Sequence, residues 1–580
     1  MRYPLLLLLP LCAALACGEA HSPAPLPLNT TPYADLVLTN GRFYTVNENQ
    51  VWAEAVAIQN GEFIYVGDSA GIEPLIGEQT QQHDLGGRFV MPGMVDSHTH
   101  PGLVSMLGPD VAEGGMIPRT SHEDIMAWLE EYAREHWLTP LIIADSWPVA
   151  LYGTEGPRKE DIDEYVSIRP VLLFDDSGHS FWINSSMLWL LGVDADTPDP
   201  APGLSYFVRD EHGRPTGWAK EFALIPFIGE WLLAGEKDRE AALVEYLEFL
   251  ASRGVTTLYD AGNLLFHDSV YALVAKLERE GRLPVRYEGT YHIMFPDQIP
   301  KAVAEMRRMR EEYGGELLRF NTVKIHFDGV GEIRTAAYLE PYEDDPKNRG
   351  ATVLTTEELT AFILELEQEE LDLHLHVVGD WATRIALDAY EAARSQAGEE
   401  LRLRLTLSHL EVVDDADSPR FAEMGIVANF TPHWHGTYFQ GARPGLGEQR
   451  WFRRERARSL HETGARLTFS SDVTGFGEMG RADPFYGMQI GHNRQDVGAE
   501  DGSIRPPANE RLSLPTLLRG YTLNGAYQLR MDDRLGSIEV GKLADALVLE
   551  RNPFEVDRGA IHQIRPAAVI RSGEVVHGGL

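Results

Sequence analysis

The chain contains very little cysteine and has few basic residues for its acid content. Only Cys12 and Cys17 occur in 580 residues, so the sequence beyond residue 17 offers no thiol for a disulfide, a metal ligand or a nucleophile. It has 51 Lys and Arg residues against 88 Asp and Glu residues, a formal net charge of -37. Nucleic acid and anionic lipid would repel this charge, so we expect neither as a partner.

Long apolar runs are also scarce, and the clearest one lies at the N-terminus. Arg2 precedes an apolar run at residues 4–16, and small residues follow, which predicts an export signal over residues 1–17. This run is shorter than the roughly 20 residues that span a bilayer. The segment Ala14-Leu15-Ala16-Cys17 resembles a bacterial lipoprotein cleavage box. Lipidation at Cys17 and an outer-membrane anchor are therefore one hypothesis, and simple cleavage with release into the periplasm is the alternative.

Both ends of the remaining chain are predicted to be β-rich. Residues 18–33 are rich in Pro and Thr and are interpreted as a tether. Residues 34–90 contain the short alternating runs LVLTNGRFYTV, AVAIQNGEFIYVG and HDLGGRFVM. Their Asn-Gly and Gly-Gly turns predict β-hairpins. Residues 535–580 show similar runs, so the two ends are expected to meet as one small β-sandwich.

The long middle, residues 91–534, alternates strand-like and helix-like segments. Thr355 and Glu358 form a capping-box pattern that opens a predicted helix, and the runs DLHLHVVGD, RLRLTLSH, IVANF and RLTFSSD read as strands. This alternation predicts an α/β fold with a parallel sheet, most economically a closed (β/α)8 TIM barrel. We expect an insertion at about residues 105–225.

Potential metal ligands follow several of these strands. His98 and His100 close VMPGMVDSHTH, and alternate strand residues share a face, so both rings can reach one ion. With 20 His in 580 residues, chance gives about 0.7 such His-x-His pairs. The sequence has three such pairs, so the His-x-His pattern alone does not establish a metal site. In barrels of this kind the catalytic residues lie at the carboxyl ends of the strands. We expect six candidate ligands at these ends: His98, His100, Lys324, His376, His409 and Asp472.

Together, these segments resemble the amidohydrolase superfamily, and in particular amidohydrolase family 3, which includes N-substituted formamide deformylases. The resemblance covers nearly all of residues 34–580. It rests on VMPGMVDSHTH, GHSFWINSSML, RPTGW, GVTTLYDAG, VKIHFDG, HVVGD, FSSD, DPFYGMQ and LGSIEVGKLADALVL. It implies a distorted (β/α)8 barrel joined to a composite β-sandwich. It also implies that the six candidates hold one or two metal ions, usually zinc, with other divalent metals an alternative, and that Asp472 is catalytic.

These residue types suit hydrolysis of an amide-like bond. Imidazole and carboxylate are zinc ligands, whereas Lys324 would need carboxylation to bridge two ions. Asp472 would act as general acid and base toward a small N-acyl or N-formyl substrate. The alternatives are a ring deaminase or cyclic amidase of the same superfamily, or a binding protein that has lost turnover. Lys324 weighs against a deaminase, since deaminases of this superfamily generally lack the bridging lysine.

Further residues have open interpretations. His374 shares a strand face with His376 and is expected to support a ligand rather than bind the ion. His179 could contact substrate from the insertion or cap a turn. His433, Trp434 and His435 could line a pocket or pack in a loop, and Arg334 could pair with a substrate carboxylate or with a protein acid. Glu411, close to His409, departs from the family pattern. The substrate of a relative therefore cannot be assigned to this protein. Homo-oligomer formation is left open.

Overall fold

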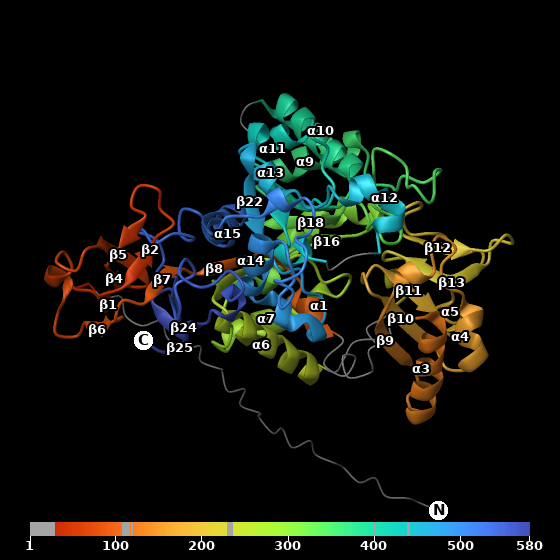
Figure 1. Ribbon diagram of the computed structural model, residues 1–580, viewed down its shortest axis with the longest axis horizontal. Helices are drawn as coiled ribbons and strands as arrows, with labels where there is room; N and C mark the ends of the chain where they lie inside the picture. Colours follow the sequence, from red (N-terminus) through yellow and green to blue (C-terminus); the bar gives the residue numbers. More distant parts are fainter. Residues whose placement is uncertain (1–29, 107–116, 118–119, 229–235, 399–400, 438–440) are drawn as a thin grey trace, which may run out of the picture.

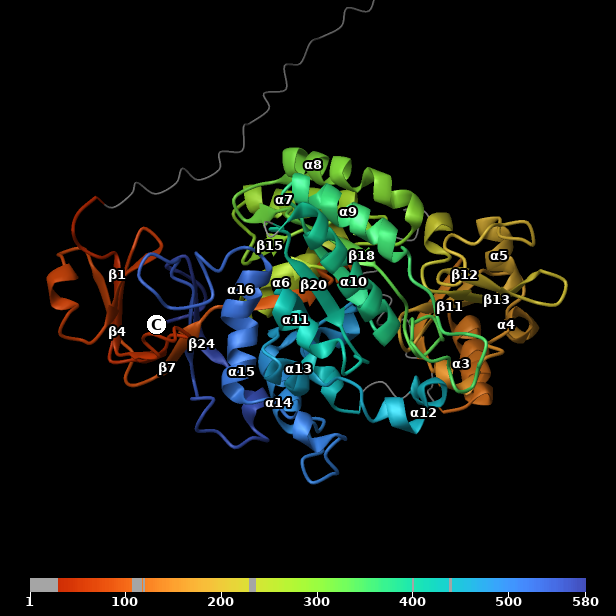
Figure 2. The ribbon, with the colours of Figure 1, turned by 90° about the horizontal axis from the view of Figure 1, so that it is seen from above.

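The computed structural model describes residues 30–106, 117, 120–228, 236–398, 401–437 and 441–580. The predicted export signal, most of the tether and Cys17 lie outside these residues. A β-rich unit, a central α/β body and a smaller unit with its own sheet lie in a row (Figures 1 and 2). Among the helices described, none combines the length and the apolar character required to cross a bilayer.

Two parallel sheets form the central body. In each, every pair of neighbouring strands is parallel. One sheet has the order β17 (Leu318–Arg319), β15 (Arg286–Glu288), β14 (Val255–Asp260) and β8 (Met94–Thr99). The other has the order β16 (His292–Ile293), β18 (Thr322–His326), β19 (Asp372–Val377), β20 (Leu405–His409), β21 (Val427–Phe430) and β22 (Arg466–Phe469).

Helices alternate with these strands along the chain. The Thr355 side chain accepts from the Glu358 N–H, and the Glu358 side chain accepts from the Thr355 N–H, so the predicted capping box is confirmed at the start of α9 (Thr356–Gln368). The segment between β21 and β22 forms two short helices, α12 (Arg443–Trp451) and α13 (Ala457–Glu462). The other helices of this body are α1 (Pro101–Met106), α6 (Glu236–Ser252), α7 (His267–Arg279), α8 (Ala302–Tyr313), α10 (Asp380–Ala397), α11 (Ser418–Met424), α14 (Pro484–Asn493), α15 (Leu514–Arg519) and α16 (Gly525–Gln528).

The last strand of the second sheet lies beside the first strand of the other sheet. In the described part of the chain no strand ladder joins β22 to β8. Side-chain and loop contacts join them instead: Ser97 Oγ donates to Phe469 O at 2.8 Å, and the Asp472 N–H donates to His98 O at 2.8 Å. These contacts bring the ends of β8 and β22 to the same place, although they are far apart in sequence.

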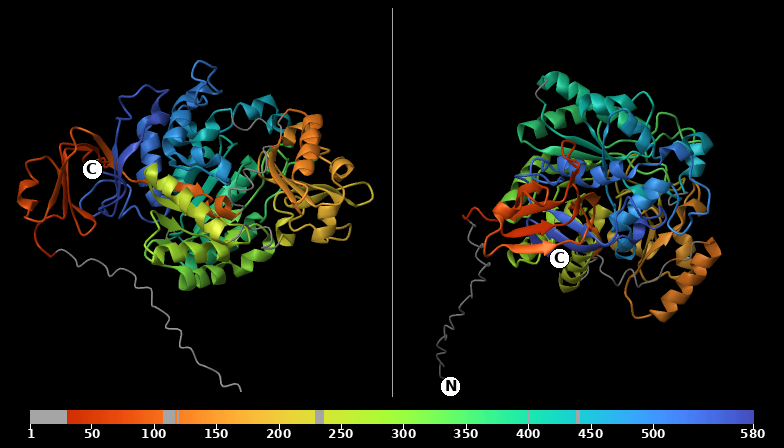
Figure 3. Two further views of the ribbon diagram at one scale, coloured as in Figure 1. Left: turned by 90° about the horizontal axis from the view of Figure 1, so that it is seen from below. Right: turned by 60° about the vertical axis from the view of Figure 1, so that its left-hand side comes forward.

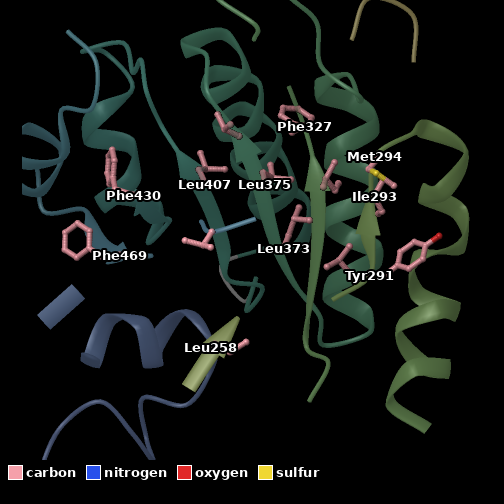
Figure 4. Packing of buried hydrophobic residues seen from close by; sticks show 14 of the residues in the cluster. Leu258, Tyr291, Ile293, Met294, Phe327, Leu373, Leu375, Leu407, Phe430 and Phe469 are labelled. Atoms are coloured by element: carbon pink, nitrogen blue, oxygen red, sulfur yellow. The ribbon is translucent and has the colours of Figure 1, made fainter. Parts of the chain in front are cut away.

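Apolar side chains between strands and helices form the main core. Figure 4 shows Leu373 and Leu375 of β19 beside Leu407 of β20, with Ile293 of β16 in the same cluster. These side chains are fully buried. Alternate residues of β19 point to opposite faces, so Leu373 and Leu375 pack outward while His374 and His376 face the other side. The same alternation therefore fills the core and presents the imidazoles.

The two ends of the chain share one sheet. Its order is β25 (Glu574–Gly578), β24 (Pro566–Arg571), β23 (Ala546–Leu549), β7 (Phe89–Pro92), β2 (Arg42–Tyr44) and β3 (Trp52–Ala53). A second sheet has the order β5 (Glu62–Gly67), β4 (Ala55–Gln59), β1 (Leu36–Thr39) and β6 (Gln81–Asp84). One buried cluster combines residues from both sheets, including Leu38, Val56, Val90 and Val548. Figure 3 shows the first strands against the C-terminal ones.

Two of the three hairpins predicted near the N-terminus are wrong. β4 and β5 do form a hairpin across Asn60-Gly61. By contrast, β1 pairs with β4 and β6, whereas β2 pairs with β3 and β7, so the Asn40-Gly41 and Gly86-Gly87 turns each carry the chain from one sheet to the other. The turn residues are present, but long-range pairing with the C-terminal strands decides which neighbours the strands take.

The third unit has a sheet of its own. Its order is β12 (Tyr206–Arg209), β13 (Pro215–Lys220), β11 (Ser180–Ile183), β10 (Val171–Asp175) and β9 (Ile142–Trp147). The helices α3 (His122–Glu135), α4 (Lys159–Tyr165) and α5 (Ser185–Leu191) lie around it (Figure 1). Buried Trp147, Trp182 and Trp218 belong to a second core cluster, which also includes Tyr338 and Trp451 of the central body. This sheet lies between β8 and β14 in the sequence, within the region expected as an insertion.

A buried ion pair ties the central body to the C-terminal strands, and its loss should be costly. Arg286 of β15 donates two hydrogen bonds to Asp545, at 2.5 and 3.1 Å, and both side chains are almost fully buried. Arg286→Ala leaves an uncompensated buried carboxylate, so we expect the free energy of unfolding to fall by about 3–5 kcal/mol in urea denaturation. The exposed pair Arg42–Glu555 provides the control, for which Arg42→Ala should cost no more than about 1 kcal/mol. Equal losses in the two variants would contradict this assignment.

Candidate functional site

Four side chains from three distant segments meet at the carboxyl ends of β8, β20 and β22. His98 Nε2 and His100 Nε2 lie 3.3 and 3.2 Å from Asp472 Oδ1. His409, at the end of β20, places its Nδ1 3.6 Å from Asp472 Oδ2. The His100 Nδ1 hydrogen-bonds Gly262 O at 2.9 Å, which fixes the ring so that Nε2 faces the carboxylate. The structure thus brings together four of the six predicted ligands around one carboxylate.

Backbone strain accompanies this convergence. His409 has a φ of 75° and Asp472 a φ of 48°, left-handed values that non-glycine residues adopt rarely. Such conformations cost roughly 1–3 kcal/mol each and cluster at functional sites. Here they turn the chain sharply at the end of β20 and just after β22, and the two side chains meet.

The donor set fits a divalent metal ion. Two donors that bind one tetrahedral zinc at about 2.1 Å are about 3.4 Å apart, close to the 3.2 and 3.3 Å between Asp472 and the two histidines. Both His409 ring nitrogens are buried without a hydrogen-bond partner among the described residues. A buried imidazole without a partner is costly unless a group that these residues do not supply satisfies it. His98, His409 and Asp472 offer three ligand atoms within 4.8 Å of one another.

The electrostatics keep these histidines in the form that binds metals. Burial lowers the pKa of His409 to about 3, although Asp472 raises it. Burial, followed by the charge of Lys324, also holds the pKa of His98 well below 6.5. Burial alone would raise the pKa of Asp472, but the hydrogen bond from His100 and the nearby His409 hold it below its usual range. Neutral imidazoles and an ionised carboxylate are metal ligands.

Lys324 lies beside this group. It is on β18, fully enclosed, with Nζ 3.4 Å from His98 Nε2. Burial lowers the pKa of Lys324 to about 7, while Asp472 raises it. A substantial fraction of this amine is therefore uncharged near neutral pH, which is the form that can react with carbon dioxide.

His374 and His376, the His-x-His pair of β19, take different positions. His374 Nε2 lies 3.0 Å from His98 Nδ1, so it can hold the tautomer and orientation of His98. The ring of His376 lies 4.4 Å from the ring of His409 between centroids. It also stacks on His326 at 4.0 Å. His376 therefore lies at the edge of the ligand group and His374 behind it.

A second cluster adjoins the first. Glu221, directly after β13, is fully buried, and its Oε2 lies 2.7 Å from His179 Nδ1 and 3.2 Å from His326 Nε2. Burial alone would lower the pKa of His179, but Glu221 raises it to about 9. Burial alone would raise the pKa of Glu221, but His179 holds it at about 2. This pair is therefore ionised across neutral pH.

One cavity of about 320 Å³ connects both clusters. Its apolar wall includes Met106, Phe174, Phe181, Phe222, Ile228 and Phe266. Acidic side chains also line it, among them Asp145 and Glu332, whereas Lys324 is the one Lys or Arg side chain in the lining drawn from the described residues. The cavity thus favours a neutral or cationic ligand with a substantial apolar part.

The remaining predicted residues separate into two groups. His179, His433 and Trp434 line the cavity, and Trp434 stacks on His409 with ring centroids 5.2 Å apart. His435 is buried but does not belong to the lining. Arg334 pairs with Asp344 and donates to Glu332 O, and it also lies outside the lining. For Arg334 the geometry is that of a structural ion pair.

Sequence reasoning missed Glu221, His326 and His292. His326 follows Lys324 by two positions on β18 and so shares its face, a signal that was available. Both nitrogens of the buried His292 on β16 lack a partner among the described residues. Glu221 gives no local signal, because its partners lie 42 residues before it and 105 residues after it.

The Glu221–His179 pair predicts a pH dependence of stability. His179 has a pKa raised from 6.5 to about 9. Its contribution is therefore fully present below about pH 6.5 and is lost as pH rises through 9. We expect Glu221→Gln to lower the free energy of unfolding more at pH 6 than at pH 9.5, measured by urea denaturation. A difference between the two proteins that grows with pH would contradict the pairing.

Comparison with known proteins supports a hydrolase. A family model described as the amidohydrolase family matches residues 81–577. The exoenzymes regulatory protein AepA of Pectobacterium carotovorum is 29% identical over 413 residues, covering 70% of this chain and 87% of that protein. The N-substituted formamide deformylase of Arthrobacter pascens is 25% identical over 545 residues, covering 92% and 97%. A crystal structure of an uncharacterized metal-dependent hydrolase from Pyrococcus furiosus aligns with a TM-score of 0.63 and 25% identity over 90% of this chain and 100% of that chain.

Proposed function

Because the chain belongs to the amidohydrolase family, hydrolases that act on carbon–nitrogen bonds, we propose that it cleaves the amide bond of a small N-acyl or N-formyl compound. The observation that carries this proposal is the approach of His98 and His100 to Asp472 at 3.3 and 3.2 Å, with His409 beside them. These separations are close to the roughly 3.4 Å expected between two ligands of one tetrahedral zinc ion.

The residues that would hold the metal are those that converge or adjoin here. We assign this role to His98, His100, Lys324, His376, His409 and Asp472, with zinc as the proposed ion and one or two ions per chain. We assign Lys324 this role as a carbamate, whose oxygens would be anionic ligands, because the protonated fraction of the amine repels a cation. When bound, the metal supplies a Lewis acid that polarises the carbonyl group and acidifies a water molecule.

Asp472 is the residue that would transfer the proton during hydrolysis. Asp472 is ionised, 11% exposed and faces the cavity, so it can accept a proton from the attacking water. Asp472 would then return this proton to the leaving nitrogen, which departs as a neutral amine. The apolar wall formed by residues such as Phe181 and Phe222 excludes bulk water and would hold the substituent on the amide.

The contacts between β8 and β22 also support a proposal about the fold. We propose that the two parallel sheets form a distorted (β/α)8 barrel, in which Ser97, Phe469, His98 and Asp472 join β8 to β22 in place of a ladder. The two β-rich sheets at the chain ends would form the composite sandwich. The shared cluster of Leu38, Val56, Val90 and Val548 supports this second assignment.

The proposed location is outside the cytoplasm. The pattern of residues 1–17 supports export, and Cys17 supports a lipid anchor in the outer membrane of a bacterium as the only membrane attachment, with a soluble periplasmic form as the alternative. Mass spectrometry of the mature N-terminus tests this, since diacylglycerol at Cys17 is expected from an anchored protein. A free N-terminus after cleavage would leave export standing and reject the anchor.

A substrate panel tests the function. Metal-loaded protein is incubated with N-benzylformamide, N-acetylglycine, hydantoin and adenine, and with His98→Ala as the blank. We expect N-benzylformamide, which is neutral and apolar, to be hydrolysed at least about 100-fold faster by the wild type than by the variant. The anionic N-acetylglycine should be a poor substrate because of the acidic lining. Ammonia release from adenine would instead support a deaminase, and equal rates in both proteins would identify a contaminant.

A further inference from the structure

His179 reaches the cavity from the third unit, not from the central body. It lies in the turn between β10 and β11, and Asp175 holds this turn by accepting hydrogen bonds from His179 N, Ser180 N and Ser177 Oγ at 2.9, 2.9 and 2.7 Å. Its side chain is 20% exposed and belongs to the cavity lining. The ring lies 5.6 Å from that of His376 between centroids, so it is close to the proposed metal ligands.

Glu221 fixes the orientation of this ring. One carboxylate oxygen accepts from His179 Nδ1 at 2.7 Å and from His326 Nε2 at 3.2 Å. The other accepts from the Thr335 hydroxyl and from the Val330 N–H. Three of these partners, His326, Thr335 and Val330, are buried, which restrains the carboxylate. Because Nδ1 is engaged by Glu221, Nε2 is the nitrogen of His179 that remains for the cavity.

The distances favour a hydrogen-bonded pair over a second metal site. The three side chains could hold an ion by proximity, since their ligand atoms lie within 4.8 Å of one another. However, two donors on one zinc are about 3.4 Å apart in a tetrahedral site, and about 3.0 Å apart at a right angle. The 2.7 Å between His179 Nδ1 and Glu221 Oε2 is shorter than either value. It is the length of a charge-assisted hydrogen bond.

The charge of Glu221 requires a cation beside it. The side chain is fully buried, and a buried carboxylate is stable only when it is paired. Thr335 and Val330 are neutral donors, and the neighbouring Lys220 sends its Nζ to Ile333 O at 2.9 Å. Of the two imidazoles on Glu221, His179 is the closer, at 2.7 Å against 3.2 Å for His326, and the more exposed, at 20% against 4%. His179 is therefore the group that carries the compensating positive charge. A charged imidazole has a second N–H, on Nε2, to donate.

We propose that His179 is a catalytic residue that donates a hydrogen bond from Nε2 to the carbonyl oxygen of the substrate, with Glu221 as the positioning residue that holds it. This inference rests on the proposed amide hydrolysis and deepens it. Negative charge develops on the carbonyl oxygen as the amide is attacked, so a fixed cationic donor stabilises the transition state more than the ground state. The third unit thereby supplies a part of the active site that the central sheets lack.

The test compares variants of the metal-loaded full chain with N-benzylformamide. We expect His179→Ala to lower kcat by about 100–1000-fold with little change in KM. Glu221→Gln should lower it by about 10–100-fold. Added imidazole should restore part of the kcat of His179→Ala but none in Glu221→Gln. His212→Ala, on the exposed turn before β13 of the same sheet, is the matched control and should match the wild type.

Two further measurements do not depend on turnover. Zinc content per chain should be the same in His179→Ala and the wild type, whereas loss of an ion would overturn the proposal in favour of a metal site. Acetate, an unreactive carboxylate, should bind the wild type at least about fivefold more tightly than His179→Ala by calorimetry, about 1 kcal/mol. Equal acetate affinity would overturn the proposal even if the wild type hydrolysed none of the amides. Hydrolysis by the wild type with unchanged kcat in His179→Ala would reject the inference and leave the proposed function standing.

Discussion

Asp472→Asn is expected to abolish nearly all hydrolysis, with a fall in kcat of about 1000–10,000-fold. The amide keeps an oxygen that can ligate metal but cannot accept a proton from water at neutral pH. Asp472 also faces His98 and His100 at 3.3 and 3.2 Å, so the loss of charge weakens the whole group. The measurement is steady-state hydrolysis of whichever amide the panel identifies.

The control for this prediction is Asp501→Asn, because Asp501 is exposed. It should behave as the wild type in kcat and in zinc content. Circular dichroism of Asp472→Asn should be that of the wild type. If the folded variant retained more than about a tenth of the wild-type kcat, Asp472 could not be the proton acceptor.

His98→Ala is expected to have the second largest effect, through metal affinity. His98 contacts Asp472, Lys324 and His374 at 3.3, 3.4 and 3.0 Å, so its removal takes a ligand from the centre of the group. We expect zinc affinity to fall by more than about 100-fold, beyond the 10–100-fold typical of a group that supports a ligand. His374→Ala should fall within that smaller range. Competition with a fluorescent chelator measures both.

His577→Ala, an exposed histidine on β25, is the control for histidine content and should leave zinc affinity unchanged. The predicted order of loss is therefore His98→Ala, then His374→Ala, then His577→Ala. A larger loss for His374→Ala than for His98→Ala would mean that His374 is the ligand and His98 its support.

Much of the candidate site could be predicted from the sequence, because the residues that mark the end of a strand are close together along the chain. The runs around β8, β19 and β20 show where buried apolar segments end in polar residues, and parallel strands place those ends at one edge. This reasoning selected His98, His376, His409 and Asp472 for one site. It also located the start of α9 from Thr355 and Glu358, since a capping box needs only four consecutive positions.

Features that depend on distant pairing could not be predicted in the same way. The turns at residues 40–41 and 86–87 have hairpin residues, yet the strands beside them separate because C-terminal β23 supplies a partner for β7. Glu221 follows a strand of the third unit, and nothing near it in sequence reveals the histidines it contacts. Its role emerges only when that unit lies against β18.

Metal quantification of the purified wild type tests the central claim most directly. The protein is produced with zinc and bicarbonate, dialysed against metal-free buffer and measured by mass spectrometry of the elements. The convergence of His98, His100, His409 and Asp472 predicts about one or two zinc ions per chain, and loss of activity on chelation with recovery on zinc addition. A folded protein that holds less than about a tenth of an ion per chain after this treatment, with full hydrolytic activity, would contradict the account.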